Sequence, residues 1–499
     1  MNYHIAIAEE HDQTLFHHLI RMDEQEDLCF VLYNLSSGNS RNTAIIKELI
    51  LPYDNERMLH GNVSFTAAYF ERVSSLALKK KCGIGFIHCH YANGWQSMSR
   101  DDIDAEKMLA PRVKAITGLP LFGLTLSRDR FWSARAWIKE GPKNYVRHDC
   151  KSIRVVGKGL RLSINEQCYP KLSFDEAFSR TISAWGEQKQ AVISRLKICI
   201  VGLGSVGSIV AEALVKTGFR DITLLDFDVV KKKNLDRLNG IGFSSIGKFK
   251  VVAIGKYLEE VSATTELKID TLTWSIIEKE GLKVALDADV IFSCVDRPWP
   301  RYILNVISYA NLIPVIDGGI DSSANSRGDN LEQARWKAHA VNPGRRCLCC
   351  LGQYAPEDVA LEQSGLLEDP HYIKDLPKDH FIHRGENVYA FSLGLAGLEM
   401  QQLLSLLLQP RGQYCGPKEY NFNSGTIDSD FEFNCKPNCE YSNDMFATGD
   451  KTNNYIFTEH QFAKDGRAAV VNALEPIQKR RSLHLKALLI WLKKKVVGR

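Results

Sequence analysis

Residues 197–230 read "KICIVGLGSVGSIVAEALVKTGFRDITLLDFDVV". An apolar run typical of a buried strand is followed by Gly202, Gly204 and Gly207, then by a helical apolar pattern and a second strand-like run. This order is typical of a βαβ unit in a parallel sheet. Glycines at such a turn let the backbone approach a phosphate at the start of a helix. The stretch predicts a Rossmann-like α/β domain, with a mostly parallel sheet, that binds a nucleotide.

The residues that follow indicate which nucleotide chemistry to expect. Asp226 lies 19 residues after Gly207, where a carboxylate can bind ribose hydroxyls, and this much also fits an NAD-dependent oxidoreductase. Three later motifs favour an enzyme that holds a triphosphate and expels pyrophosphate, because Arg offers a planar fork to phosphate oxygens and Lys a point charge. They are "DFDVVKKKNLDRL" (226–238), "GKFK" (247–250) and "SCVDRPWPRYILN" (293–305).

In order and spacing these motifs resemble the ubiquitin-activating-like adenylating family that includes ThiF and MoeB. The resemblance covers residues 174–440 and implies that the domain binds ATP and Mg²⁺. It implies a ribose-binding acid, an Asn/Arg pair, a phosphate lysine and a magnesium-associated acid, with two further matches in the next helix. These residues are, in that order, Asp226, Asn234 with Arg237, Lys250 and Asp296, then Arg301 and Asn305.

A helical segment is expected ahead of this domain, over residues 174–193, and it contains "FSRTI" (178–182). It is similar to the family segment from which an arginine reaches into the ATP site of a partner subunit. The resemblance therefore implies a homodimer in which Arg180 contacts the partner's nucleotide.

A second motif, "GFIHCHYANGWQSMSRDD" (85–102), lies in the first third of the chain. A strand that ends in His-x-His points both imidazoles to one face, because side chains alternate along a strand. His88 and His90 with a later Asp could supply three zinc ligands and leave the fourth position to water, as in catalytic zinc sites. The alternative is a pair of strand-end histidines with a packing role.

This arrangement resembles the JAB/MPN (JAMM) metalloprotease family, whose members cleave after the tails of ubiquitin-like proteins. The resemblance covers residues 1–165 and implies a mixed α/β domain. It implies that Glu26 is the acid–base group, that His88, His90 and Asp102 bind zinc, and that Ser99 lies on the oxyanion side.

Two features differ from the family pattern. Tyr91 replaces the usual proline, and the loop to Ser99 is about one residue longer than is common. Asp101 is therefore an alternative third ligand. Glu24 is a weaker alternative to Glu26, because it lies farther from the strand.

Two cysteine pairs predict a second zinc site. "RRCLCC" (345–350) contains Cys347 and Cys350, and "FNCKPNCEYS" (433–442) contains Cys435 and Cys439, so that four thiolates are available. The family pattern would use Ser442 in the second pair, and Cys435 is expected to replace it. A vestigial site without metal is the alternative.

The thioester nucleophile of many relatives has no obvious counterpart. The chain has no cysteine between Cys350 and Cys415. Cys415 and Cys349 are the two alternatives, and adenylation is a firmer expectation than thioester transfer.

Composition limits the setting. A net charge of +4 over 499 residues does not indicate a nucleic-acid partner. Thirteen cysteines and a mixed, acidic N-terminus without an apolar leader predict a cytoplasmic protein. The apolar stretch near the C-terminus is shorter than the roughly 20 residues of a membrane span, so no membrane is expected. Residues 441–499 are predicted to form an extension that ends in a basic helix near "KALLIWLKKK" (486–495).

Together the two resemblances imply one substrate, the C-terminal glycine of a ubiquitin-like β-grasp protein. The chain resembles bacterial fusions associated with ubiquitin-like modification in antiviral defence. That resemblance includes a conjugating enzyme among the partners to be considered for this chain. Three alternatives remain: an activator of a sulfur-carrier protein, a scaffold with an inactive JAB domain, and an NAD oxidoreductase.

Overall fold

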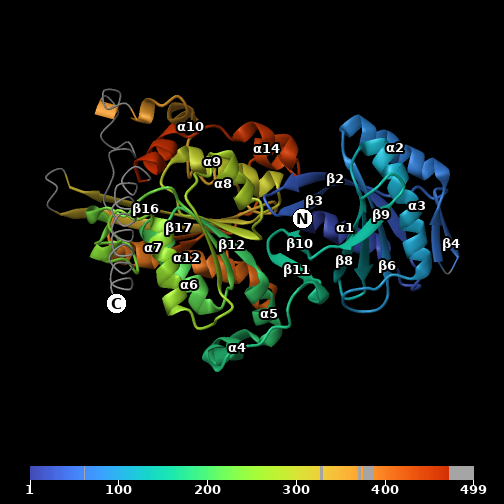
Figure 1. Cartoon of the computed structure of the whole chain (residues 1–499), viewed down its shortest axis with the longest axis horizontal. Coiled ribbons are helices and arrows are strands. Elements are labelled where there is room, and N and C mark those ends of the chain that lie inside the picture. The colour runs from blue at the N-terminus through green and yellow to red at the C-terminus, as the bar shows by residue number, and fades with distance from the viewer. Residues whose placement is uncertain (61, 326–329, 369–372, 375–386, 471–499) are drawn as a thin grey trace, which may run out of the picture.

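The computed structural model describes residues 1–60, 62–325, 330–368, 373–374 and 387–470. It contains a nine-stranded sheet, an eight-stranded sheet and a two-stranded ribbon. In Figure 1 the nine-stranded sheet lies among the blue to teal elements and the eight-stranded sheet among the green to red elements. The predicted basic helix at 486–495 lies outside the described residues.

The nine-stranded sheet is mixed, in the order β11-β10-β1-β3-β2-β6-β7-β8-β9. Its central strands are buried on both faces, because helices cover each side. Its strands are β1 (Asn2–Ala8), β2 (Leu28–Ser37), β3 (Arg41–Ile50), β6 (Gly83–His90), β7 (Leu121–Ser127), β8 (Trp132–Lys139), β9 (Tyr145–Asp149), β10 (Ser152–Val156) and β11 (Leu160–Ile164).

Side chains alternate along β2 as the strand period requires. Leu28 and Phe30 pack in one core cluster with residues of α2 (Ala67–Lys80) and α3 (Arg100–Thr117). Cys29 and Val31 pack in another cluster with residues of α1 (Glu9–Leu19). The N-terminal region is thus a sheet-rich domain with helices on both faces, which confirms the expected α/β character.

A short strand precedes the first helix that packs on β2. Residues 63–65 belong to β5 (Asn62–Phe65), which pairs with β4 (Arg57–His60), although their apolar spacing continues into α2. The helix begins at Ala67, because the Thr66 hydroxyl accepts a hydrogen bond from the Tyr69 N–H and caps its first turn.

The eight-stranded sheet follows the predicted Rossmann-like pattern. Its order is β14-β13-β12-β15-β16-β17-β18-β19, and the first five strands are parallel. The chain moves from β12 to β13 on one side and later returns to β15 on the other, so the switch point lies at β12. The strands are β12 (Lys197–Val201), β13 (Asp221–Leu225), β14 (Lys268–Leu272), β15 (Val290–Ser293), β16 (Val315–Ala324), β17 (Leu331–Val341), β18 (Lys418–Asn421) and β19 (Thr426–Ser429).

Helices cover both faces of this sheet. Residues of α6 (Ser205–Thr217), α7 (Lys250–Val261) and α12 (Tyr389–Leu408) pack in one core cluster, and those of α8 (Lys279–Ala285) and α9 (Pro298–Ala310) in another. α12 is long and apolar enough to cross a membrane, but 61% of its most apolar 18-residue stretch is buried inside the protein. Its contacts with α6, β16 and β17 make it a core helix.

Shorter helices complete the second region. The expected helical segment over 174–193 is divided at Gly186, whose φ of 88° suits glycine. The shorter helices are α4 (Ser179–Trp185), α5 (Glu187–Arg195), α10 (Pro356–Gln363), α13 (Glu440–Asn443) and α14 (Asp450–Ile456).

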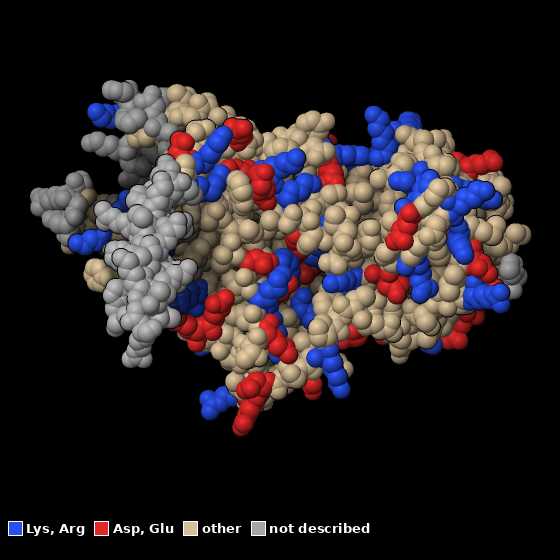
Figure 2. Space-filling view, in the orientation of Figure 1, with Lys and Arg blue, Asp and Glu red and all other residues tan. Residues whose placement is uncertain are grey.

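Charged side chains of both signs are interspersed over the face of the molecule shown in Figure 2.

The two sheets are joined by a shared core and by buried polar contacts. Ala6, Ile45 and Val156 of the first sheet belong to the same buried cluster as the inner residues of β12 and α6. The Arg41 guanidinium pairs with Asp289 across 2.6 Å, and both side chains are buried. α14 returns from the C-terminal region to β2, which it contacts beside the first sheet (Figure 1).

Candidate functional site

The glycine turn lies at the carboxyl end of β12. A Cβ at Gly202, where φ is 91°, would lie 2.4 Å from the carbonyl oxygen of Cys294, and a Cβ at Gly207 would lie 2.0 Å from the carbonyl oxygen of Gly202. Neither position admits a side chain. A Cβ at Gly204 would meet nothing within 4 Å, so the space above the start of α6 is open. An anion can approach the backbone there.

Asp226 fixes this turn from the end of β13. One carboxylate oxygen accepts the Leu203 N–H at 2.6 Å, and the other accepts the Asp228 N–H at 2.7 Å. Burial raises the pKa of Asp226, although the neighbouring Lys250 opposes that shift. The carboxylate is thus held against the loop in which Gly204 lies.

Lys250 is the buried cation of the site. Its Nζ donates to an Asp228 oxygen at 2.8 Å and lies 3.8 Å from an Asp226 oxygen. Burial lowers the pKa of Lys250, but Asp226, Asp228 and the more distant Asp296 raise it, and the net pKa lies above its ordinary value. A charged ammonium therefore lies beside the glycine turn.

The other predicted nucleotide residues are not all gathered around Lys250. The Asn234 side chain accepts the Lys231 N–H at 2.9 Å and shapes its own turn. Arg237 donates to the Lys233 carbonyl at 2.7 Å and pairs with Asp236. Asp296 and Arg180 are both exposed, and Arg180 projects from α4. None of these contacts joins Arg237 or Arg180 to Lys250 within one chain.

Of a buried polar cluster around Asp317, only Arg301 was expected from the sequence. Asp317 accepts hydrogen bonds from Ser293 at 2.6 Å and interacts with His339 at 3.1 Å. The Arg301 Nε lies 3.4 Å from Asp317. Glu399 is fully buried, and burial together with Asp317 raises its pKa well above the ordinary value. The "IDGGID" stretch at 316–321 was the available signal, since an acid directly after an apolar strand marks the functional edge of a parallel sheet.

The histidine motif forms a second site at the end of β6. The Nε2 atoms of His88 and His90 lie 3.2 Å apart, and the two Asp102 oxygens lie 3.6 Å and 3.5 Å from them. Burial lowers the pKa of His88 to about 3, so that this imidazole is neutral, as a metal ligand must be. Asp101 is exposed and lies outside the group.

These distances fit a tetrahedral zinc ion. Ligands about 2.0–2.1 Å from zinc lie roughly 3.3 Å from one another in a tetrahedron. The two imidazole nitrogens, 3.2 Å apart, are close to that value, and Asp102 turns one carboxylate oxygen toward His88 and the other toward His90. Two imidazoles and one carboxylate are also a usual donor set for zinc.

Two acids and a serine flank the group. Burial raises the pKa of Glu26, His90 lowers it and Asp102 raises it, and the net pKa lies above the ordinary value. Glu24 turns to Arg128 at 3.0 Å and has no such neighbours among the described contacts. The Ser99 hydroxyl accepts the Asp102 N–H at 3.1 Å and caps α3, so its observed role is to hold Asp102.

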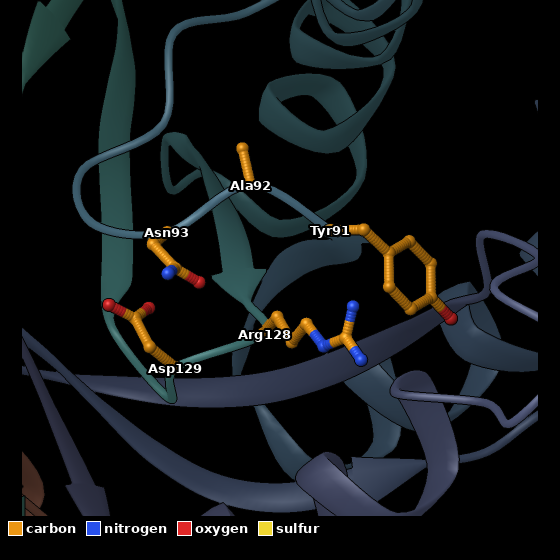
Figure 3. A pocket seen from close by; sticks show the side chains of 5 residues that line it. All are labelled: Tyr91, Ala92, Asn93, Arg128 and Asp129. Carbon is orange, nitrogen blue, oxygen red and sulfur yellow. The ribbon is translucent and has the colours of Figure 1, made fainter.

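Tyr91 ties the loop after His90 to the segment before Glu26. The Tyr91 hydroxyl donates to the Gln25 carbonyl at 3.1 Å and accepts the Arg21 N–H at 3.0 Å. A cleft of about 560 Å³ begins at this residue (Figure 3). It is lined by Tyr91, Ala92, Asn93, Arg128 and Asp129.

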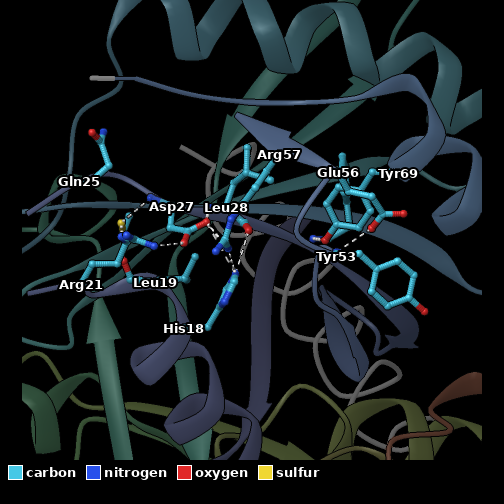
Figure 4. A network of polar contacts seen from close by, with 12 residues as sticks. His18, Leu19, Arg21, Gln25, Asp27, Leu28, Tyr53, Glu56, Arg57 and Tyr69 are labelled. Atoms are coloured by element: carbon cyan, nitrogen blue, oxygen red, sulfur yellow. Dashed lines mark hydrogen bonds and ion pairs between the residues drawn. The ribbon is translucent and has the colours of Figure 1, made fainter. Parts of the chain in front are cut away.

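A network of polar contacts surrounds Asp27, the residue that follows Glu26 in the chain (Figure 4). The fully buried Asp27 carboxylate accepts from Arg57 at 2.8 Å, and Arg21 lies 3.6 Å away. Its backbone pairs with Cys89, the residue between the two histidines, through an N–H to Asp27 carbonyl bond of 3.3 Å. The network therefore links the segment of Glu26 to the strand of His88 and His90.

The four predicted zinc cysteines come together. The Sγ atoms of Cys347, Cys350, Cys435 and Cys439 all lie within 4.8 Å of one another. The Cys347 thiol donates to Cys435 and lowers the pKa of Cys435 to about 5. Ser442 instead donates to the Cys439 carbonyl at 3.2 Å. Cys435 therefore supplies the sulfur that the family pattern expects at position 442. Four converging sulfur atoms are a usual donor set for structural zinc.

Two curated proteins resemble part of the chain. The adenylyltransferase and sulfurtransferase UBA4 of Meyerozyma guilliermondii is 29% identical over 155 residues, which is 30% of this chain and 36% of that protein. The tRNA threonylcarbamoyladenosine dehydratase 2 of Saccharomyces cerevisiae is 28% identical over 149 residues, 29% of this chain and 33% of that protein. The matches span about a third of the length of these relatives.

The crystal structure of MccB from E. coli aligns with 58% of this chain and 76% of its own, at 17% identity and a TM-score of 0.41. The ThiF family matches residues 178–437, just over half of the chain. These residues contain the glycine turn, Asp226, Lys250 and three of the four zinc-site cysteines, and Cys439 lies two residues beyond the match. The chain belongs to the ThiF family.

Proposed function

We propose that the C-terminal region adenylates the C-terminal carboxylate of a ubiquitin-like or sulfur-carrier β-grasp protein with ATP. The observation that carries this proposal is the charged Lys250 ammonium, held by Asp226 and Asp228 beside an open glycine turn. A hydride-transfer enzyme needs no buried cation at this place. A triphosphate does need one, because charge develops on its oxygens as pyrophosphate leaves.

The reaction requires little covalent help from the protein. An oxygen of the substrate carboxylate attacks the α-phosphorus, the bond to the β-phosphate oxygen breaks, and pyrophosphate leaves with the electron pair. Backbone N–H groups at the start of α6 would bind phosphate oxygens, Asp226 would bind the ribose, and Lys250 would stabilise the phosphate charge. Asp296 would hold Mg²⁺, which supplies charge neutralisation to the triphosphate.

Two predicted arginines act differently in this proposal. Arg180 is exposed on α4 and is free to reach a second copy of the chain, so we propose a homodimer. Arg237 would turn from the Lys233 carbonyl toward the phosphates when ATP binds. The similarity to UBA4, an adenylyltransferase and sulfurtransferase, favours a sulfur carrier as the second candidate substrate.

We further propose that the N-terminal region is a JAB/MPN-like zinc hydrolase that cleaves after the same glycine. His88, His90 and Asp102 would hold the zinc ion, which supplies an activated water when bound. Glu26 has a raised pKa and would accept the proton of that water and return it to the leaving amine. Ser99 would act mainly by fixing Asp102, because its hydroxyl caps α3.

An ATP–pyrophosphate exchange assay with candidate β-grasp proteins tests adenylation. Exchange should require the small protein, and Lys250→Ala should lower the rate about 10²- to 10³-fold, as loss of a charge-stabilising donor does. Lys256→Ala is the matched control, because Lys256 lies on the same helix but is 77% exposed. Equal rates in both variants would refute the proposal, as would binding of NAD that is unaffected by Lys250→Ala.

Metal content tests the hydrolase. The purified chain should contain two zinc ions, one at each predicted site. His88→Ala should lose one of them together with cleavage of a β-grasp protein extended beyond its last glycine, and it should retain pyrophosphate exchange. A His88→Ala chain that keeps its full zinc content and its cleavage activity would remove the metal from this mechanism.

A further inference from the structure

A segment beyond the family match crosses the carboxyl edge of the nucleotide-binding sheet. The Thr458 N–H donates to the Ile277 carbonyl at 3.0 Å. Arg467 donates to the Thr273 carbonyl at 3.0 Å and pairs with Glu278 at 2.8 Å. Its guanidinium also lies 4.2 Å from the centre of the Trp274 ring. Residues 273–278 follow β14, so residues 458–467 are fastened at the end of that strand.

The same segment places two aromatic rings beside the candidate ribose site. The His460 ring lies 5.3 Å from that of Phe227, and the Phe462 ring lies 6.0 Å from it. Phe227 follows Asp226 directly in the chain. The His460 ring also lies 6.3 Å from the ring of Trp299, which lies in the first turn of α9, shortly after Asp296.

The direction of a bound nucleotide brings its base toward these rings. In a parallel sheet of this type the phosphates lie at the glycine turn and the ribose at the acid that ends the next strand. Here the glycine turn follows β12 and Asp226 follows β13, so the base points toward the end of β14. That is the place where residues 458–467 are fastened.

The Phe462 ring leaves an apolar face exposed to solvent. It is 57% exposed although it faces Phe227, and such an apolar face gains burial when a flat ring stacks on it. Ala463, the next residue, is fully buried, so the backbone that carries Phe462 is anchored. A ring on a fixed backbone can serve as a preformed wall.

We propose that residues 458–467 form one wall of the base-binding pocket, with His460 and Phe462 contacting the adenine of ATP. The inference rests on the proposed adenylation and extends it, since it assigns base recognition to a segment outside the family match. Arg467 is a positioning residue in this account, because it fastens the segment through Glu278 and does not reach the nucleotide.

Binding of two ligands to the full chain tests the proposal. ATP carries the base, whereas inorganic tripolyphosphate offers only the phosphates. His460→Ala combined with Phe462→Ala should weaken ATP binding about tenfold, which corresponds to about 1.4 kcal/mol and lies within the range of base–aromatic stacking. The affinity for tripolyphosphate should not change.

Tyr455→Ala is the matched control, because Tyr455 is an aromatic residue of α14 that is 87% exposed. It should bind ATP as the unmodified chain does. Arg467→Ala should reproduce the ATP defect in part with both rings present, which separates loss of the wall from loss of one ring. Thermal unfolding of each variant identifies any that fails to fold.

Two results would overturn the inference alone. One is equal ATP affinity in the double variant and the unmodified chain. The other is tighter ATP binding in the double variant, which would mean that the segment occupies the place of the base. An unmodified chain that binds no ATP would instead overturn the proposed adenylation, and the inference with it.

Discussion

Replacing Asp27 with Asn should weaken the candidate zinc site without touching a zinc ligand. The substitution keeps the size of the side chain and the oxygen that accepts the Leu28 N–H, but removes the charge that pairs with Arg57 and Arg21. Because the Asp27 carboxylate is fully buried, these are charge-assisted contacts of about 1.5–3 kcal/mol. Asp27 also pairs with the backbone of Cys89, between the two histidines.

The size of the effect follows from that contact energy. If about 2 kcal/mol is lost in the linkage between the segment of Glu26 and the strand of the histidines, zinc affinity falls by up to about 30-fold. A change of 10- to 100-fold is typical when a partner behind a metal site is removed. Competition between the protein and a chromogenic chelator measures this affinity. Both the Asp27→Asn variant and its reference protein would carry Cys347→Ser, so that only the histidine site binds zinc in the titration.

Glu56→Gln provides the matched control for this experiment. Glu56 is also a buried acid, 8% exposed, and it pairs with Arg72 through a hydrogen bond of 2.9 Å. It appears in Figure 4 but makes no contact with Cys89 or Glu26 among the described residues. It should lower thermal stability and leave zinc affinity intact. If Asp27→Asn and Glu56→Gln change zinc affinity equally, the reasoning about the Asp27 network is wrong.

Three further outcomes are expected. Arg41→Met should cost about 3–5 kcal/mol in denaturant unfolding, since it strands buried Asp289, and adding Asp289→Asn should recover part of the loss; equal losses would contradict the pairing. Cys347→Ser should remove one zinc ion and lower the melting temperature, whereas Cys349→Ser, outside the four-sulfur group, should do neither. Glu399 has a raised pKa in the fold, so the free energy of unfolding should fall as pH rises above about 4.3, the ordinary pKa of Glu. Glu399→Gln should remove that decline, and a pH dependence that Gln leaves unchanged would exclude Glu399 as its source.

Local patterns predicted the fold where they were strong. The glycine turn and its flanking apolar runs gave β12, α6 and β13, because the backbone at Gly202 and Gly207 tolerates no other residue. The start of α2 at Ala67 does not follow from periodicity, because the ribbon of β4 and β5 ahead of it depends on pairing between strands. The break at Gly186 could have been expected from the glycine itself.

The candidate sites divide in the same way. The two histidines and Asp102 were close enough in sequence for strand alternation and one short loop to bring them together. The Asp317 cluster was missed because Ser293, His339 and Glu399 come from three distant elements. No single stretch of sequence contains that arrangement. The Phe227 and His460 contact is likewise invisible without the chain's three-dimensional path.

The core shared by the two sheets has a mechanical consequence. Apolar residues of β1, β3 and β10 are packed among those of β12 and α6, and α14 closes back onto β2. Cutting the chain near residue 170 would expose apolar surface on both pieces, and we expect neither piece to stay folded and soluble alone. The two proposed sites therefore belong to one rigid packing unit without a hinge between them. A substrate tail that used both would have to leave one proposed site before it entered the other, and heating should unfold the two regions in a single calorimetric transition.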